Sequence, residues 1–92
     1  MGRLAFNSAK AAHDGNRDIV RFWAADGDKQ ILCAVSHEAL TDYTGSTTAN
    51  AAELVGLYQA HAGRIHSIAQ QKYDRGVLES DGLILVRSAD LT

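Results

Sequence analysis

The sequence predicts a two-layer α+β domain, in which a small, mainly antiparallel sheet carries one long amphipathic helix on one face. Two patterns lead to this fold class. Residues 18–25 and 29–36 are rich in apolar and β-branched side chains and are joined at Asp26-Gly27, a dipeptide typical of tight hairpins. Residues 51–75 carry apolar side chains at three- and four-residue steps, which indicates a helix with one buried face. The expected order is β-β-β-α-α-β.

Composition narrows the class of protein. The 92 residues, 46% hydrophobic and 22% charged, fit one globular domain over residues 1–92. Nine Lys and Arg against eleven Asp and Glu give a net charge of −2, without the basic excess expected of a nucleic-acid-binding protein. The apolar runs are too short for a membrane span, and the N-terminus lacks a signal-peptide core. Cys33 is the single cysteine, which excludes an internal disulfide and favours a cytoplasmic location.

The N-terminal part is expected to form an arm over residues 1–8, followed by a weak strand over residues 9–13. Leu4 and Phe6 alternate with their neighbours, so the arm could also contain a short strand. Asp14-Gly15-Asn16 then predicts a turn, because Gly and Asn tolerate the positive φ that hairpin turns need.

The hairpin that follows has a predicted register. If Asp26 and Gly27 form a two-residue loop, Phe22 lies opposite Ile31 and Val20 lies opposite Cys33. Because side chains alternate along a strand, one face then collects a set of apolar residues. This face comprises Val20, Phe22, Ile31, Cys33 and Val35, with Ala9 and Ala11 joining it through the first turn. The reverse face comprises Ile19, Arg21, Trp23, Leu32 and Ala34.

The helical half of the chain begins with a short helix over residues 37–42, for which Ser36 is the predicted N-cap and Glu38 favours the helix dipole. A polar loop over residues 44–50 follows. Asn50 with Glu53 resembles a capping box, although Thr47 or Thr48 could equally cap the next helix. That long helix, residues 51–75, is expected to bury Leu54, Leu57, Tyr58, His61, Ile65, Ile68 and Ala69. A final strand over residues 83–86 and a tail over residues 88–92 complete the chain.

One helix can cover only one face of the sheet, which leaves the reverse face as the first candidate site. Its apolar character predicts an interface, and Trp is common among interface anchors. The residues expected to carry the interaction are Ile19, Arg21, Trp23 and Leu32. The alternative is that residues 1–8 or the C-terminal tail fold over this face. The first interpretation predicts a homodimer or a docked protein partner.

Several short segments resemble a known family. They are Val20-Arg21-Phe22-Trp23, Asp26-Gly27, the run from Cys33 to Ser36 leading into Glu38-Ala39-Leu40, Tyr58, Arg64-Ile65-His66 and the ending near Asp90-Leu91. From about Phe6 onward the chain is similar to short bacterial proteins classed only as a domain of unknown function. The resemblance implies a small α+β fold of one sheet with helices packed on it. It implies no activity and no catalytic residue.

The four histidines and the single cysteine are the residues that could carry catalysis or bind a metal. His61 and His66 are five residues apart and would point about 140° away from each other on one helix, which does not suit a shared metal. His13 and His37 have no Cys partner nearby in the sequence, so no metal or other cofactor is predicted. Cys33 on the dry face of a strand is expected to be a core residue, whose pKa burial raises. We therefore expect no enzyme, with a minor activity of His61 or Cys33 as the remote alternative.

A second candidate site lies along the long helix. His61 falls among apolar residues, where it is either a satisfied core histidine or a titrating group. With Tyr58 and Arg64 it could line a pocket between helix and sheet for a small molecule or an anion. The alternative function is therefore a ligand-binding regulatory domain, against the preferred interpretation of a non-catalytic interaction module.

Overall fold

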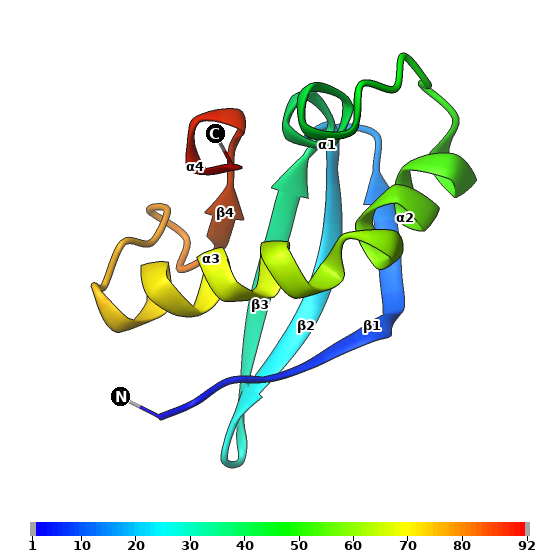
Figure 1. Ribbon diagram of the computed structural model, residues 1–92. Helices are drawn as coiled ribbons and strands as arrows, with labels where there is room; N and C mark the ends of the chain where they lie inside the picture. The colour runs from blue at the N-terminus through cyan, green and yellow to red at the C-terminus, as the bar shows by residue number, and fades with distance from the viewer. Residues whose placement is uncertain (1, 92) are drawn as a thin grey trace.

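The computed structural model describes residues 2–91 and contains one four-stranded sheet in the order β1-β2-β3-β4 (Figure 1). The strands are β1 (Ala5–Asp14), β2 (Ile19–Asp26), β3 (Lys29–Ser36) and β4 (Ile84–Val86). The first three pair antiparallel in sequence order, and β4 adds parallel to β3. The predicted α+β class with a mainly antiparallel sheet is confirmed.

Within the described residues four helices accompany the sheet: α1 (His37–Thr44), α2 (Ala51–Ala60), α3 (Ala62–Asp74) and α4 (Ser88–Leu91). Figure 1 shows α2 and α3 running in succession across the sheet. α2 packs against β1 and α3 against β4. α4 occupies the region predicted as a tail and packs against α1 and α3.

The long helix predicted over residues 51–75 is two helices, separated at His61. This residue has φ −115° and ψ 20°, and no side chain caps the helix that follows it. Its N–H still donates to the Leu57 carbonyl at 3.1 Å, so the segment is kinked rather than interrupted. Gly56 and Gly63 flank the kink, and each lowers helix propensity by about 1 kcal/mol relative to Ala. The weak propensity on both sides lets packing on β1 and on β4 set two helix directions.

The hairpin register differs from the prediction by two residues. Phe22 pairs with Cys33 and Val20 with Val35, so the loop is Gly27-Asp28 rather than Asp26-Gly27. Gly27 has φ +60°, a conformation that Gly adopts without steric cost at the first loop position. Because a shift of two residues keeps every side chain on its predicted face, the two faces were assigned correctly despite the wrong pairing.

The N-terminal region also differs from the prediction. Residues 5–8 were expected in an arm, but they form the first part of β1. The pairing of β1 with β2 shifts between Asn7 and Ala12, as at a β-bulge. Ala11 reaches the core, whereas Ala9, predicted on the same face, is exposed. A straight alternation cannot hold across a register shift.

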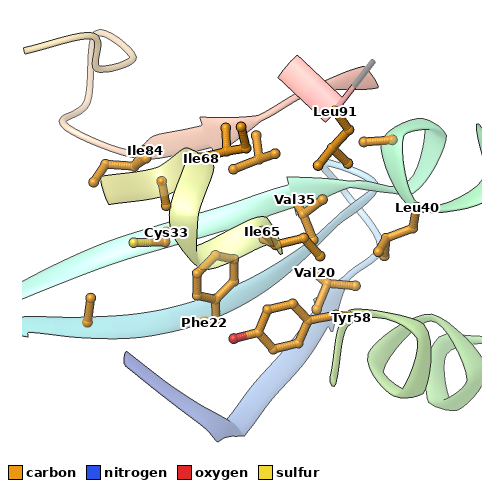
Figure 2. Close-up of a cluster of buried hydrophobic side chains, with 14 of the residues drawn as sticks. Val20, Phe22, Cys33, Val35, Leu40, Tyr58, Ile65, Ile68, Ile84 and Leu91 are labelled. Atoms are coloured by element: carbon orange, nitrogen blue, oxygen red, sulfur yellow. The ribbon is translucent and has the colours of Figure 1, made fainter. Parts of the chain in front are cut away.

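The core lies between the sheet and the helices. All five residues of the predicted dry face are buried, in one cluster with Leu54, Tyr58, Ile65 and Ile84. Figure 2 shows Tyr58, Ile65 and Ile84 in this cluster. The predicted caps are also present, since the Ser36 hydroxyl accepts from the Ala39 N–H at 3.0 Å. Asn50 accepts from the Glu53 N–H at 3.0 Å. These caps fix where α1 and α2 begin.

Candidate functional site

The reverse face of the sheet divides into a closed end and an open end. At the closed end Ile19 and Ala34 are buried together with Leu83. Arg17 in the β1–β2 turn reaches Asp81 before β4 at 3.2 Å, and so crosses this end of the face. Of the predicted interaction residues, Ile19 is therefore buried, Leu32 half-buried, and Arg21 and Trp23 exposed.

The open end of the reverse face is organised around Trp23. This side chain is 43% exposed and stands between two hollows. A hollow of about 470 Å³ on the β1 side is lined by Asn7, Lys10 and Gln30 among others. A second hollow of about 330 Å³ is lined by residues that include Leu32, Leu78, Leu83 and Asp81. Leu78 is itself 45% exposed, so apolar surface continues from Trp23 across the second hollow.

The predicted ligand site around Tyr58, His61 and Arg64 is not brought together as one cluster. Tyr58 is fully buried, and its hydroxyl lies 2.6 Å from Nε2 of His66. His61 stands at the kink, half-buried, with its ring edge-on to Tyr43 at 5.3 Å between centroids. Arg64 is exposed. Burial raises the pKa of Tyr58 above its ordinary value, so this hydroxyl stays protonated.

His66 is the residue that sequence reasoning missed. Its ring stacks on Phe6 at 4.2 Å between centroids and 6° between planes, while Phe22 stacks on Tyr58 at 4.6 Å. Burial lowers the pKa of His66, which keeps the imidazole neutral and able to accept from the Tyr58 hydroxyl. Tyr58 and His66 are eight residues apart, about 12 Å along the axis of a straight helix, so the spacing alone does not pair them and the kink at His61 is what brings them together.

A hollow of about 330 Å³ lies beside this ring cluster. Arg3 and Phe6 line it from the N-terminal segment, and His66, Ser67 and Gln70 line it from α3. Gln70 is already engaged, because its amide accepts from the Leu4 N–H at 2.7 Å and donates to Asp74 at 2.9 Å. The remaining polar side chains at this hollow are the cation of Arg3, the neutral imidazole of His66, the hydroxyl of Ser67 and the amide of Gln71.

Cys33 lies in the core, as expected. It is fully buried between the sheet and the helices, and burial raises its pKa to about 12 (Figure 2). A thiol with this pKa carries almost no thiolate at neutral pH, and the thiolate is the reactive form. The geometry gives Cys33 a packing role.

A polar cluster forms where the β1–β2 turn meets the start of α1. His13 and His37 both approach Asp18, with Nε2 of His13 at 3.6 Å and Nδ1 of His37 at 3.0 Å from one carboxylate oxygen. Nε2 of His13 is buried and has no hydrogen-bond partner within the described chain. Over residues 2–91 no three His, Cys, Asp or Glu side chains are arranged to hold a metal ion. None of the helices in residues 2–91 is long and apolar enough to cross a membrane.

Comparison with known proteins places the chain in a family. The model of a family described as "Protein of unknown function (DUF1488)" matches residues 4–86. The chain belongs to the DUF1488 family. The resemblance to short proteins of unknown function, inferred from the sequence, is thereby confirmed. No curated protein matches the chain significantly.

A solved structure from the DUF1488 family supports the same fold. It is the crystal structure of a protein of unknown function from Shewanella loihica PV-4. The TM-score is 0.86 at 16% sequence identity, and the match covers 94% of this chain and 93% of that chain. At this identity the likeness shows the DUF1488 fold alone.

Proposed function

We propose that this DUF1488 protein is a non-catalytic interaction module of the cytoplasm, which forms a homodimer through the open end of its reverse sheet face. The observation that carries the proposal is the exposure of Trp23 between two hollows, with Leu78 exposed beside it. A half-exposed Trp in a polar-rimmed apolar surface is typical of an interface anchor.

A second copy of the chain is the partner that we propose for this surface. Lys10 borders the hollow on one side of Trp23, and Lys29 and Asp81 border the hollow on the other side, where Asp81 is already paired with Arg17. Because the two hollows do not differ in the sign of their charge, the support for this association is the burial of the exposed Trp23 and Leu78 side chains. A two-fold axis through the Trp23 region buries both side chains of each copy against its partner. The net charge of −2 opposes such an association only weakly.

The experiment is absolute mass by light scattering over a dilution series, for the wild type and for Trp23→Ala. We expect a dimer for the wild type and a monomer for the variant. Tyr43→Ala is the matched control, because Tyr43 is an aromatic residue of α1 with 40% exposure. Circular dichroism verifies that each variant is folded. A wild type that stays monomeric at every concentration, or a Trp23→Ala variant that dimerises as well as the wild type, overturns the proposal.

A second candidate function, a small-anion-binding regulatory domain, is favoured by the hollow beside His66. Arg3 supplies a cation there, and His66 and Ser67 supply polar groups, whereas Arg64 lines none of the hollows described above. Thermal shift assays with small carboxylates and phosphate test this function. Saturable stabilisation that is lost in Arg3→Ala and kept in Arg64→Ala supports the hollow. If the stabilisation is lost in Arg64→Ala and kept in Arg3→Ala, the ligand binds at the site predicted from the sequence, around Arg64, and not in this hollow.

A further inference from the structure

The loop over residues 45–50, which joins α1 to α2, is held to the rest of the domain through His37. Nδ1 of this histidine lies 3.0 and 3.1 Å from the two carboxylate oxygens of Asp18 in the β1–β2 turn. Nε2 lies 2.9 Å from the backbone carbonyl oxygen of Thr48. One imidazole therefore bridges two segments that are far apart in the sequence.

Both partners of His37 are hydrogen-bond acceptors. A backbone carbonyl cannot donate, and neither can an ionised carboxylate. A neutral imidazole has one N–H and one lone pair, so it can satisfy Thr48 or Asp18 but turns a lone pair toward the other. Both contacts are favourable together only when both ring nitrogens carry a proton.

The surroundings of His37 favour that charged form. Its pKa is raised, chiefly by the hydrogen bond to the Thr48 carbonyl; desolvation opposes this shift, and the hydrogen bond and charge of Asp18 add to it. His13 from β1 faces the same carboxylate, and Glu38 is the next residue in α1. Arg17, next to Asp18, is paired with Asp81. The loop itself contains no titratable side chain.

We propose that His37 is a proton-controlled clasp, which ties the loop to the β1–β2 turn when protonated and releases it when neutral. The backbone of His37 stays joined to that of Asp18 whether or not the ring is protonated, since the backbone N–H of His37 donates to the backbone carbonyl of Asp18 at 3.0 Å. The other hydrogen bonds of the loop in the described chain are local, joining residues two to four apart. A neutral His37 keeps its single ring proton on Nδ1, because the Asp18 carboxylate is a stronger acceptor than the Thr48 carbonyl, so the contact with Thr48 is the one that is lost.

The direction of the pH effect follows from the raised pKa. A group whose pKa is higher in the folded state stabilises that state below its unfolded pKa, and this contribution disappears as pH rises through the folded pKa. The clasp is closed at mildly acidic pH, where His37 is protonated. It opens on the alkaline side of the His37 titration.

Two measurements test the clasp. Long-range ¹H–¹⁵N spectra give the protonation of both His37 ring nitrogens and its pKa, which we expect above the ordinary value of about 6.5. Hydrogen exchange of residues 45–50, corrected for the intrinsic pH dependence, should become about tenfold faster above this pKa, the lower range expected for a lost charged hydrogen bond. The rest of the backbone should show no such step.

Two variants and a control distinguish the effect of the His37 clasp from the effect of a change in the net charge of the protein. Asp18 has φ +54°, which Asn tolerates well, so Asp18→Asn keeps the turn while lowering the pKa of His37. The exchange step should move to lower pH with it. His37→Gln should remove the step, and Asp28→Asn, an equal charge change in the exposed β2–β3 loop, should leave it in place. A His37 pKa at or below 6.5, an exchange rate without a step, or an equal effect of Asp28→Asn overturns the proposal.

Discussion

The hydroxyl of Tyr58 lies 2.6 Å from Nε2 of His66, across the kink that separates α2 from α3. This hydrogen bond is partly buried, with the ring of Phe6 stacked on His66 and the ring of Phe22 stacked on Tyr58. It joins the two helices at the margin of the core, where partial burial strengthens the interaction. The pair thus links the direction of one helix to that of the next.

Removing the hydroxyl tests this link. Tyr58→Phe keeps the ring but leaves Nε2 of His66 without its donor in a partly buried site, which should lower the free energy of unfolding by about 1–2 kcal/mol. Urea denaturation measures the difference, with Tyr43→Phe as control because that ring is exposed. The His66 imidazole should also lose its hydrogen-bonded ¹⁵N shift. Equal stability of the two variants would contradict a stabilising Tyr58–His66 bond.

Substitution of the glycines that flank the kink should raise the free energy of unfolding, in contrast to Tyr58→Phe. A Cβ at Gly56 or Gly63 would meet no atom within 4 Å, and neither residue has positive φ. Gly56→Ala and Gly63→Ala should therefore each stabilise the protein by about 0.5–1 kcal/mol, measured by thermal and urea unfolding.

The contrasting control for these substitutions is Gly27→Ala. Gly27 also has open space around it, but its φ of +60° makes a side chain unfavourable, so this variant should be less stable than the wild type. If Gly56→Ala and Gly63→Ala were destabilising as well, the kink would need its glycines for a reason that local helix propensity does not supply.

The contact between Tyr73 and Asp26 predicts that the stability of the folded protein falls at acid pH. The Tyr73 hydroxyl donates to an Asp26 carboxylate oxygen at 2.5 Å, and this bond is the main cause that lowers the pKa of Asp26. A lowered pKa in the folded state stabilises the protein above the unfolded pKa of about 3.9 and loses that contribution as pH falls through the folded value.

Tyr73→Phe measures this contribution. The variant should be less stable than the wild type at pH 7, and the difference should shrink between about pH 4 and the lowered pKa of Asp26. Unfolding curves at a series of pH values provide the test, and Asp26→Asn should show the same loss of pH dependence. A wild-type-to-variant difference that is constant down to acid pH would exclude Asp26 as the linked group.

The sequence was sufficient to predict the parts of the fold that depend on the alternation of side chains along a strand or on helix capping. The faces of the hairpin, the Ser36 and Asn50 caps and the burial of Cys33 all depend on side-chain period or on immediate neighbours. The pairing of Phe22 was wrong by two residues because Asp26-Gly27 identifies a turn but does not say which residues flank the loop. The bulge in β1 and the kink at His61 were missed because both arise from packing between distant elements.

The candidate site was harder to predict for the same reason. Trp23 was assigned correctly to the reverse face, but the burial of Ile19 depends on Leu83 and on the ion pair of Arg17 with Asp81. A straight helix would put His61 in the apolar stripe with Tyr58, whereas the kink places His66 beside Tyr58 instead. The meeting of His37 and Asp18 required the start of β2 and the start of α1 to be adjacent, which no single segment reveals.

The parallel pairing of β3 with β4 has a consequence for how the chain folds. Short turns join β1, β2 and β3. In contrast, the pairing of Cys33 in β3 with Ile84 in β4 closes a loop that contains α1, α2 and α3. Closing so large a loop is entropically costly, so β4 should dock late. Until then, the outer edge of β3 is open in the nascent domain, and during synthesis this strand is exposed to mispairing with another chain.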